Sequence, residues 1–393
     1  MLVAFLTLVI LLLLLVQDAK GNFVYWSNQS PGATLGRAKI NGTGANNGFI
    51  AGIDQPRGVA VDARFIYWAA GGGGAASIGR ANLDGSGVNH QFISTGVTNP
   101  DALAVTTSGI FWVNQVGMGG FSIGRANIDG SNPNPNFITG SIDGGGLAAD
   151  SIFLYFFGGD GVHIGRAQLN GSGVDSNFIA IPDHFAGLAV DPTFLYWSRT
   201  GASTVGRVPV GGGTAEGAFV PSGTTLGGPC GVAVNSQYLF WGNQDALAIG
   251  RSNINGSSPN PALITGPSNP CLMAAAPSNK ITFSKTKYDK KKGTARINAK
   301  VPGPGQVTLT TTRPSTASAS APSVVKQVGL TLTAKGAFGL PVKPKGKTLK
   351  ALKKKGKAKV SVFVTYTPST VAGVPNTKQR NLKLVKKLKK KKK

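Results

Sequence analysis

Hydrophobic and polar residues alternate in short runs along the first two thirds of the chain, with turn residues between the runs. The stretch that begins at Gly58 shows the unit most clearly. An alternating apolar run comes first, followed by a run that ends in Tyr67-Trp68, a glycine-rich turn, a run through Gly79-Arg80, and a last run at Phe92-Ile93. Four short strands per period, separated by turns, predict the blade of a β-propeller.

Two landmarks recur six times, and six copies predict six blades. An aromatic pair closes the second strand of each blade, and it contains all five tryptophans of the protein. We interpret these pairs as core between blades. A Gly-Arg pair marks the third strand, and we interpret its arginine as structural, with a packed alkyl stem and a hydrogen-bonded head. The tryptophans are Trp26, Trp68, Trp112, Trp197 and Trp241, and the arginines are Arg37, Arg80, Arg125, Arg166, Arg207 and Arg251.

The phase of the repeat predicts how the ring closes. The chain enters at the second strand of a blade, Asn22–Trp26, and supplies its last inner strand at Leu272–Ala276. That last strand should therefore pair in front of the N-terminal three and complete a shared blade. Such closure removes free sheet edges and joins the two ends of the ring.

The repeat resembles the YWTD propeller of the low-density-lipoprotein receptor class B repeats. The resemblance covers Asn22 to Ala276 and rests on GLAVDPTFLYW (Gly187–Trp197) and SIGRANLDGS (Ser77–Ser86). It implies a six-bladed scaffold in which the repeated arginines hold strands and blades together. The Asp of the YWTD box is absent from all six copies, so any family feature that needs this carboxylate is not implied.

Charge divides the chain into two parts. Residues 1–277 hold 11 Lys and Arg against 14 Asp and Glu, a net charge of −3, whereas residues 278–393 hold 30 against one, a net of +29. Ala295, Ile297, Ala299 and Val301 alternate with polar residues, which is typical of half-buried strands. We therefore predict an all-β protein: a six-bladed propeller over 22–277, a basic immunoglobulin-like β-sandwich over 278–381, and a Lys-rich tail over 382–393. The basic part resembles modules that end many exported bacterial propeller proteins.

The N-terminal segment Met1–Val16 is apolar and carries no charge. As a helix it would rise only about 24 Å, which is short for a hydrocarbon core of about 30 Å. We predict a signal peptide over 1–21, with an uncleaved anchor as the alternative. Either one predicts a secreted or cell-surface protein.

The two cysteines fit that compartment. Cys230 and Cys271 each follow a proline and precede an inner strand, one blade apart. A disulfide between neighbouring inner strands is predicted, and two buried thiols are the alternative.

Catalytic chemistry has little support in the sequence. No histidine pair has metal-ligand spacing, so we predict no metal site and no cofactor. The acids that end inner strands, Asp62, Asp150 and Asp191, are interpreted as turn caps. An enzyme of the six-bladed lactonase or lyase type, with its site at the channel mouth, stays open as the alternative to a binding protein.

A binding face can be placed by topology. Loops that enter the inner strands share one face of a propeller with the loops between second and third strands. These loops differ between blades where the scaffold repeats, as recognition loops do on a rigid frame. We expect a protein or glycan ligand there. The predicted contact residues are Arg57, Asp101, Asn114, His184, Phe185 and Arg199.

The lysine tracts of the C-terminal part, Lys343–Lys359 and Leu382–Lys393, form either solvated tails or a site for polyanions. For an exported protein we expect an anionic cell-wall polymer or a membrane surface as partner. No stacking aromatics are interleaved with the lysines, which disfavours nucleic acid. The predicted attachment residues are Lys386, Lys387, Lys389, Lys390, Lys391, Lys392 and Lys393.

Overall fold

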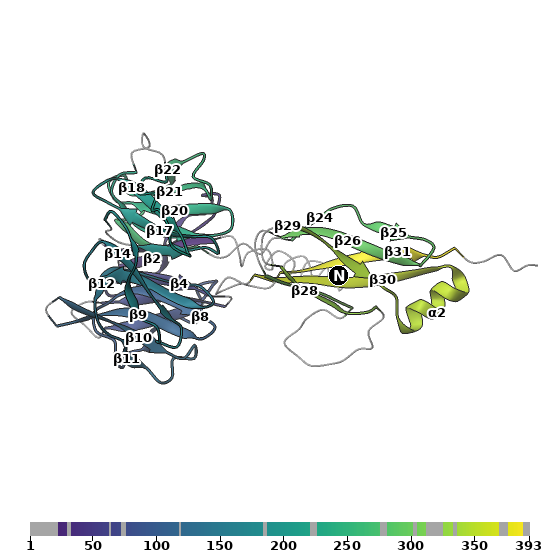
Figure 1. Ribbon diagram of the computed structural model, residues 1–393, viewed down its shortest axis with the longest axis horizontal. Coiled ribbons are helices and arrows are strands. Elements are labelled where there is room, and N and C mark those ends of the chain that lie inside the picture. Colours follow the sequence, from purple (N-terminus) through teal and green to yellow (C-terminus); the bar gives the residue numbers. More distant parts are fainter. Residues whose placement is uncertain are drawn as a thin grey trace, which may run out of the picture. The chain divides into compact units, whose positions relative to one another are not determined.

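The described residues are almost entirely β-structure, with one helix among them (Figure 1). The described residues up to 275 form one compact unit, and those from 281 form a second. No helix among the described residues is long and apolar enough to cross a bilayer, and the predicted signal peptide lies outside them. The computed structural model describes residues 23–29, 33–62, 64–71, 76–117, 119–183, 187–220, 226–275, 281–301, 305–311, 325–332, 336–368 and 376–387.

Six antiparallel sheets make up the first unit, one for each predicted blade. In the described part of blade five, an isolated bridge between Arg207 and Glu216 stands in for a fourth strand. From the inner to the outer strand, the first three blades are β23 (Pro270–Ala275), β1 (Phe23–Asn28), β2 (Thr34–Lys39), β3 (Asn46–Ile50); β4 (Pro56–Val61), β5 (Phe65–Ala70), β6 (Ser77–Asn82), β7 (Asn89–Ile93); and β8 (Pro100–Thr106), β9 (Gly109–Val116), β10 (Gly120–Ala126), β11 (Asn134–Ile138). The other three are β12 (Ile142–Ala149), β13 (Phe153–Gly158), β14 (His163–Gln168), β15 (Asp175–Ala180); β16 (Leu188–Val190), β17 (Phe194–Arg199), β18 (Thr204–Pro209); and β19 (Pro229–Val234), β20 (Tyr238–Asn243), β21 (Ala248–Asn253), β22 (Asn260–Thr265).

The ring closes as the repeat phase predicted. Strand β23, from the end of the propeller sequence, pairs antiparallel with β1 and places Met273 opposite Trp26. Each inner strand also contacts the inner strand of the next blade, and β23 contacts both β19 and β4. Closure through a shared blade is therefore confirmed, and no inner strand of the ring lacks neighbours.

Six hydrophobic clusters fill the spaces between adjacent blades, one cluster per interface. The two members of each aromatic pair point to opposite sides of their blade, because successive side chains of a strand alternate. Tyr67 thus packs in the cluster that holds Trp112 of the next blade, while Trp68 packs in the cluster that holds Tyr25 of the previous one. The interpretation of these pairs as inter-blade core is confirmed.

The glycine of each Gly-Arg pair makes room for the aromatic ring of the preceding strand. Gly79 is the register partner of Trp68, and a Cβ added at Gly79 would overlap the indole ring. The same conflict arises at the glycine of every other blade, against Trp26, Trp112, Phe156, Trp197 and Trp241. The ring therefore lies flat on bare backbone, and the repeat keeps the glycine for close approach.

The repeated arginines stack on aromatic rings, a contact that the repeat pattern did not predict. The guanidinium carbon of Arg80 lies 4.3 Å from the ring centroid of Phe65 and 3.8 Å from that of Phe92. These rings come from the second and fourth strands of the blade, so Arg80 connects the outer strands of its sheet. Arg37, Arg166 and Arg207 also stack between two rings. The guanidinium carbon of Arg125 lies farther from its two rings, at 5.9 and 5.4 Å, and that of Arg251 stacks on the ring of Tyr238.

Two of these arginines also connect blades. Arg37 donates to the carbonyl of Leu83 at 2.9 Å, and Arg251 donates to the carbonyl of Ile40 at 2.8 Å. Each acceptor lies in the following blade. The interpretation of these residues as structural, with hydrogen-bonded heads, is confirmed at these two positions. It is also confirmed at Arg125 and Arg207, whose guanidinium groups donate to the Ser108 carbonyl and to the Glu216 carboxylate.

The second unit is a sandwich of two antiparallel sheets. Side chains from both sheets, such as Ile297, Leu340 and Val362, share one buried core. This agrees with the predicted all-β sandwich. One sheet contains β24 (Thr282–Phe283), β25 (Lys287–Asp289), β26 (Thr294–Val301) and β29 (Gly336–Val342), and the other contains β28 (Val328–Leu332), β27 (Gly305–Thr310), β30 (Lys357–Pro368) and β31 (Asn376–Val385).

Two details of the predicted lysine tracts were wrong. The tract Lys343–Lys359 includes a helix, α2 (Gly346–Lys355), whose Leu352 is buried in the sandwich core. The tail does not begin at 382, because β31 continues to Val385 and buries Leu382 and Leu384. High lysine content concealed both elements, since their apolar positions are few. Residues 388–393, with Lys389–Lys393, lie outside the described residues.

The contact between glycine and tryptophan can be tested with a matched pair of variants. Gly79→Ala should destabilise the propeller by about 1–3 kcal/mol, because the new methyl group overlaps Trp68 in a packed interface. Gly201→Ala is the control, since a Cβ there meets no atom within 4 Å. Denaturant melts followed by tryptophan fluorescence report on the propeller alone, because all five tryptophans lie in it. Equal midpoints for the two variants would contradict this account.

Candidate binding face of the propeller

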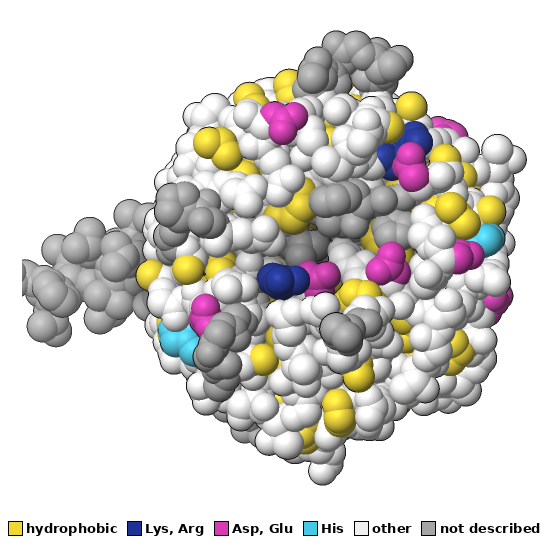
Figure 2. Space-filling view, turned by 90° about the vertical axis from the view of Figure 1, so that its left-hand side faces the viewer, with side chains coloured by type: hydrophobic (Ala, Val, Ile, Leu, Met, Phe, Trp, Pro, Cys, Tyr) yellow, Lys and Arg dark blue, Asp and Glu magenta, His cyan; other side chains and the backbone are white. Residues whose placement is uncertain are grey.

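The inner strands present equivalent residues at one rim of the central channel. Arg57, Asp101, Cys230 and Cys271 each follow the proline that begins an inner strand, and therefore occupy the same position in four blades. Figure 2 shows one face of the propeller, hollowed at its centre, with a basic side chain and acidic side chains at the edge of the hollow. At this rim, therefore, one position of the repeat carries different side chains in different blades.

Two predicted contact residues, Arg57 and Asp101, form an ion pair across the rim. Nη1 of Arg57 lies 3.4 Å from Oδ1 of Asp101, and the side chains are 33% and 20% exposed. The other carboxylate oxygen of Asp101 accepts the backbone N–H of Gly145 at 2.8 Å. The pair thus ties the inner strands of blades two, three and four, while both charged groups remain accessible from solvent.

Cys230 and Cys271 form a disulfide, as predicted, with their Cα atoms 4.9 Å apart. The bond joins β19 to β23 and so links blade six to the closing blade. Together with the ion pair, it ties five of the six inner strands at one rim. The sixth inner strand is β16. Residues 184–186, which precede it, are outside the described residues, and they include the predicted contacts His184 and Phe185.

Beneath the rim, the described inner strands border a small space. A cavity of about 20 Å³ is lined by backbone and apolar side chains, among them Leu103, Leu147, Leu188 and Met273. A space of this size holds about one water molecule. Among the described residues, no three His, Cys, Asp or Glu side chains gather in a way that could hold a metal ion.

Asn114 was predicted as a ligand contact, and that prediction was wrong. Its side chain is 1% exposed, and its oxygen accepts from the indole of Trp112 at 2.8 Å and from the backbone N–H of Thr98 at 2.9 Å. Its amide nitrogen donates to the carbonyl of Pro135. The residue therefore joins the loop entering the blade to the outermost strand. Asn28 and Asn243 stand at the same place and bond in similar ways.

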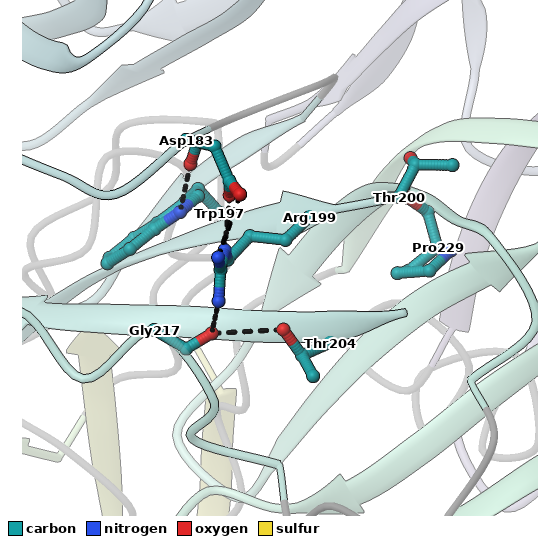
Figure 3. Close-up of polar contacts among 7 residues, drawn as sticks. All are labelled: Asp183, Trp197, Arg199, Thr200, Thr204, Gly217 and Pro229. Atoms are coloured by element: carbon teal, nitrogen blue, oxygen red, sulfur yellow. Dashed lines mark hydrogen bonds and ion pairs between the residues drawn. The ribbon is translucent and has the colours of Figure 1, made fainter. Parts of the chain in front are cut away.

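Arg199 fills the equivalent position in blade five and performs the same task (Figure 3). Its guanidinium donates to both carboxylate oxygens of Asp183, with an Nη2–Oδ2 distance of 2.8 Å, and to the carbonyl of Gly217 at 2.8 Å. The Asp183 carboxylate raises the pKa of Arg199 through these hydrogen bonds. The side chain of Arg199 is 15% exposed, so the predicted contact is mainly a structural tie, and Asp183, 51% exposed, is its accessible partner.

The acids that end inner strands cap turns, in agreement with their interpretation. Oδ1 of Asp62 accepts the backbone N–H groups of Arg64 and Phe65, at 2.6 and 2.7 Å. The second oxygen accepts the hydroxyl of Tyr67 at 2.9 Å. The same bonds recur at Asp150 with Tyr155 and at Asp191 with Tyr196. Each carboxylate thus makes these hydrogen bonds within its own blade.

Comparison with known proteins supports the fold. No protein-family model and no curated protein matches the chain. One chain of a nidogen–laminin complex aligns with 17% identity and a TM-score of 0.53, over 65% of this chain and 98% of that chain. TolB from Acinetobacter baumannii aligns with 14% identity and a TM-score of 0.50, over 66% of this chain and 67% of that chain. A gluconolactonase from Xanthomonas campestris aligns with 19% identity but a TM-score of 0.41, over 57% and 84%. At these identities the first two matches show a shared β-propeller fold and nothing more.

The disulfide should contribute to stability through the long loop that it closes. Its cysteines are 41 residues apart, for which loop-closure entropy gives about 3–4 kcal/mol. Replacing both cysteines by serine should therefore lower the melting temperature of the propeller in oxidising buffer. A reducing agent should lower the melting temperature of the native chain but leave that of the variant unchanged. Native protein that carries two alkylatable thiols would contradict the bridge.

Buried tyrosines predict a loss of propeller stability in alkali. Burial raises the pKa of Tyr25 to about 12, above the unfolded value of about 10. The folded state favours the neutral phenol, so this contribution is complete below pH 10 and is lost as the pH rises toward about 12. Melts followed by tryptophan fluorescence across that range should show the decline, and Tyr25→Phe should make it shallower. An identical decline in the variant would assign the effect to other groups.

Proposed function

We propose that this protein is an exported, non-enzymatic binding protein in which a YWTD-like propeller recognises a protein or glycan ligand. The basic second unit attaches the molecule to an anionic surface. The observation that carries the proposal is the contrast between the two units. Residues 1–277 carry a net charge of −3, and their described inner strands line a cavity of only about 20 Å³, whereas residues 278–393 carry a net charge of +29.

The rim supports a binding role for the propeller. Arg57 and Asp101 are partly exposed charged groups on a rigid ring, so a ligand meets them at little ordering cost. The cavity below has room for about one water, too little for a sugar-sized substrate. This favours recognition over the face of the ring, whereas the lactonase or lyase alternative would need a substrate site at the channel mouth.

The recognition role can be tested on protein and glycan arrays with the full-length chain. Arg57→Gln and Asp101→Asn should each weaken the captured interaction by about tenfold, as loss of a polar contact to a charged group costs 1.5–3 kcal/mol. Lys39→Gln, on an exposed position of β2 away from the rim, is the control. Tryptophan fluorescence melts will show whether each variant keeps its fold. A ligand whose binding ignores both rim variants would place recognition elsewhere on the propeller.

Attachment by the basic unit should depend strongly on salt, because each neutralised anion releases a counterion. Retention of the full-length chain on cell-wall fragments and on anionic vesicles should therefore fall steeply across a salt series. Retention that is unchanged by salt would leave the lysines as a solvated surface and would contradict electrostatic attachment.

A further inference from the structure

Lysines from three segments meet at one end of the second unit. These segments are the turn Lys290–Lys292 after β25, the stretch Lys353–Lys359 from the end of α2 into β30, and Lys383–Lys387 at the end of β31. Backbone hydrogen bonds connect them: Lys387 donates to the carbonyl of Lys290 at 2.8 Å, and Lys386 donates to that of Gly356 at 2.7 Å. Figure 1 shows α2 and the β25 turn at this end of the sandwich. We call the lysines of these three segments the lysine pole.

The pole gathers positive charge that the unit itself cannot neutralise. Residues 278–393 contain a single acid, Asp289. One oxygen of its carboxylate accepts the backbone N–H groups of Lys291 and Lys292, at 2.9 and 3.0 Å, and so caps the turn. Lys359 and Lys383 are exposed register partners on neighbouring strands. Like charges placed directly opposite each other destabilise a sheet.

The fold holds these charges in place despite their repulsion. Lys353, Lys354 and Lys355 form the last turn of α2, where the helix dipole favours cations. Gly356 ends the helix in the left-handed conformation, with φ of 68°, and its N–H bonds to the carbonyl of Leu352. The buried Leu352, Leu382 and Leu384 fix the helix and β31 to the core. The pole is therefore a preorganised cationic surface rather than a loose tail.

One aromatic side chain accompanies the lysines. Tyr288, on β25 directly before the turn of the pole, is 46% exposed, more than any other described aromatic residue. A tyrosine with an apolar ring and a polar hydroxyl is suited to the headgroup level of a membrane, where it inserts beside lysines that contact lipid phosphates. The pole contains lysine and no arginine, which favours charge attraction over the paired hydrogen bonds that recognise one anionic group.

We propose that the lysine pole, with Tyr288, docks the protein on the surface of an anionic lipid bilayer. This inference rests on the electrostatic attachment proposed above and assigns that attachment to the folded end of the sandwich. The partner is the layer of lipid phosphates, which many lysines contact together, rather than a single soluble anion.

The test uses the full-length protein and sedimentation with phosphatidylcholine vesicles, with and without phosphatidylglycerol. The double variant Lys291→Glu/Lys354→Glu changes two exposed lysines of the pole, and Lys285→Glu/Lys300→Glu changes two exposed lysines outside it by the same charge. The pole variant should bind phosphatidylglycerol vesicles at least about tenfold more weakly than the control variant, as each lysine near such a surface contributes about a factor of five. Tyr288→Ser should also weaken vesicle binding. Melts followed by circular dichroism will verify that all variants fold.

Each alternative outcome is distinguishable. If both double variants bind vesicles equally, the pole is not the docking surface, although electrostatic attachment through other lysines would stand. If beads coated with polyphosphate retain the native chain but anionic vesicles do not, its partner is a polymer and the membrane inference is overturned. If the native chain binds neither, both this inference and the proposed attachment fail.

Discussion

Burial of aromatic side chains between blades is the interaction on which the propeller depends. Trp68 finds its hydrophobic neighbours in blade one and Tyr67 finds them in blade three, so no blade can complete its core alone. A ring of such blades is stable only when its last interface forms. The pairing of β23 with β1 supplies that interface from opposite ends of the propeller sequence, and the bond between Cys230 and Cys271 holds it closed.

The same constraint separates the features that recur in each blade for packing from those that can serve binding. The repeated glycines leave room for the aromatic rings that cover them, and the arginines stack on aromatic rings. Asn114 and Arg199 join the entering loop to the outer segment of their blade. Charged residues are therefore not automatically available for ligands. At the channel rim, the partly exposed ion pair of Arg57 and Asp101 belongs to single blades and not to the repeat, which makes it the better candidate.

The two units solve opposite electrostatic problems. In the propeller, several charged side chains make internal hydrogen bonds, whereas the second unit carries a high density of positive charge on a small sandwich. Its continuous core, shared by both sheets and α2, offsets the repulsion, and an anionic surface would relieve it further. Charge thus connects the fold of the second unit to its proposed task.

The sequence by itself determined six blades, the shared closing blade and the neighbouring cysteines, because each follows from a fixed period and phase along the chain. It also placed Arg57 and Asp101 in one loop set, but not their ion pair. Only the tertiary structure decided that Asn114 and Arg199 are structural ties, since their partners, Pro135 and Asp183, come from other strands and loops. Likewise, alternation alone could not reveal α2 or the end of β31, because a few buried leucines in lysine-rich segments become a core only when the two sheets face each other.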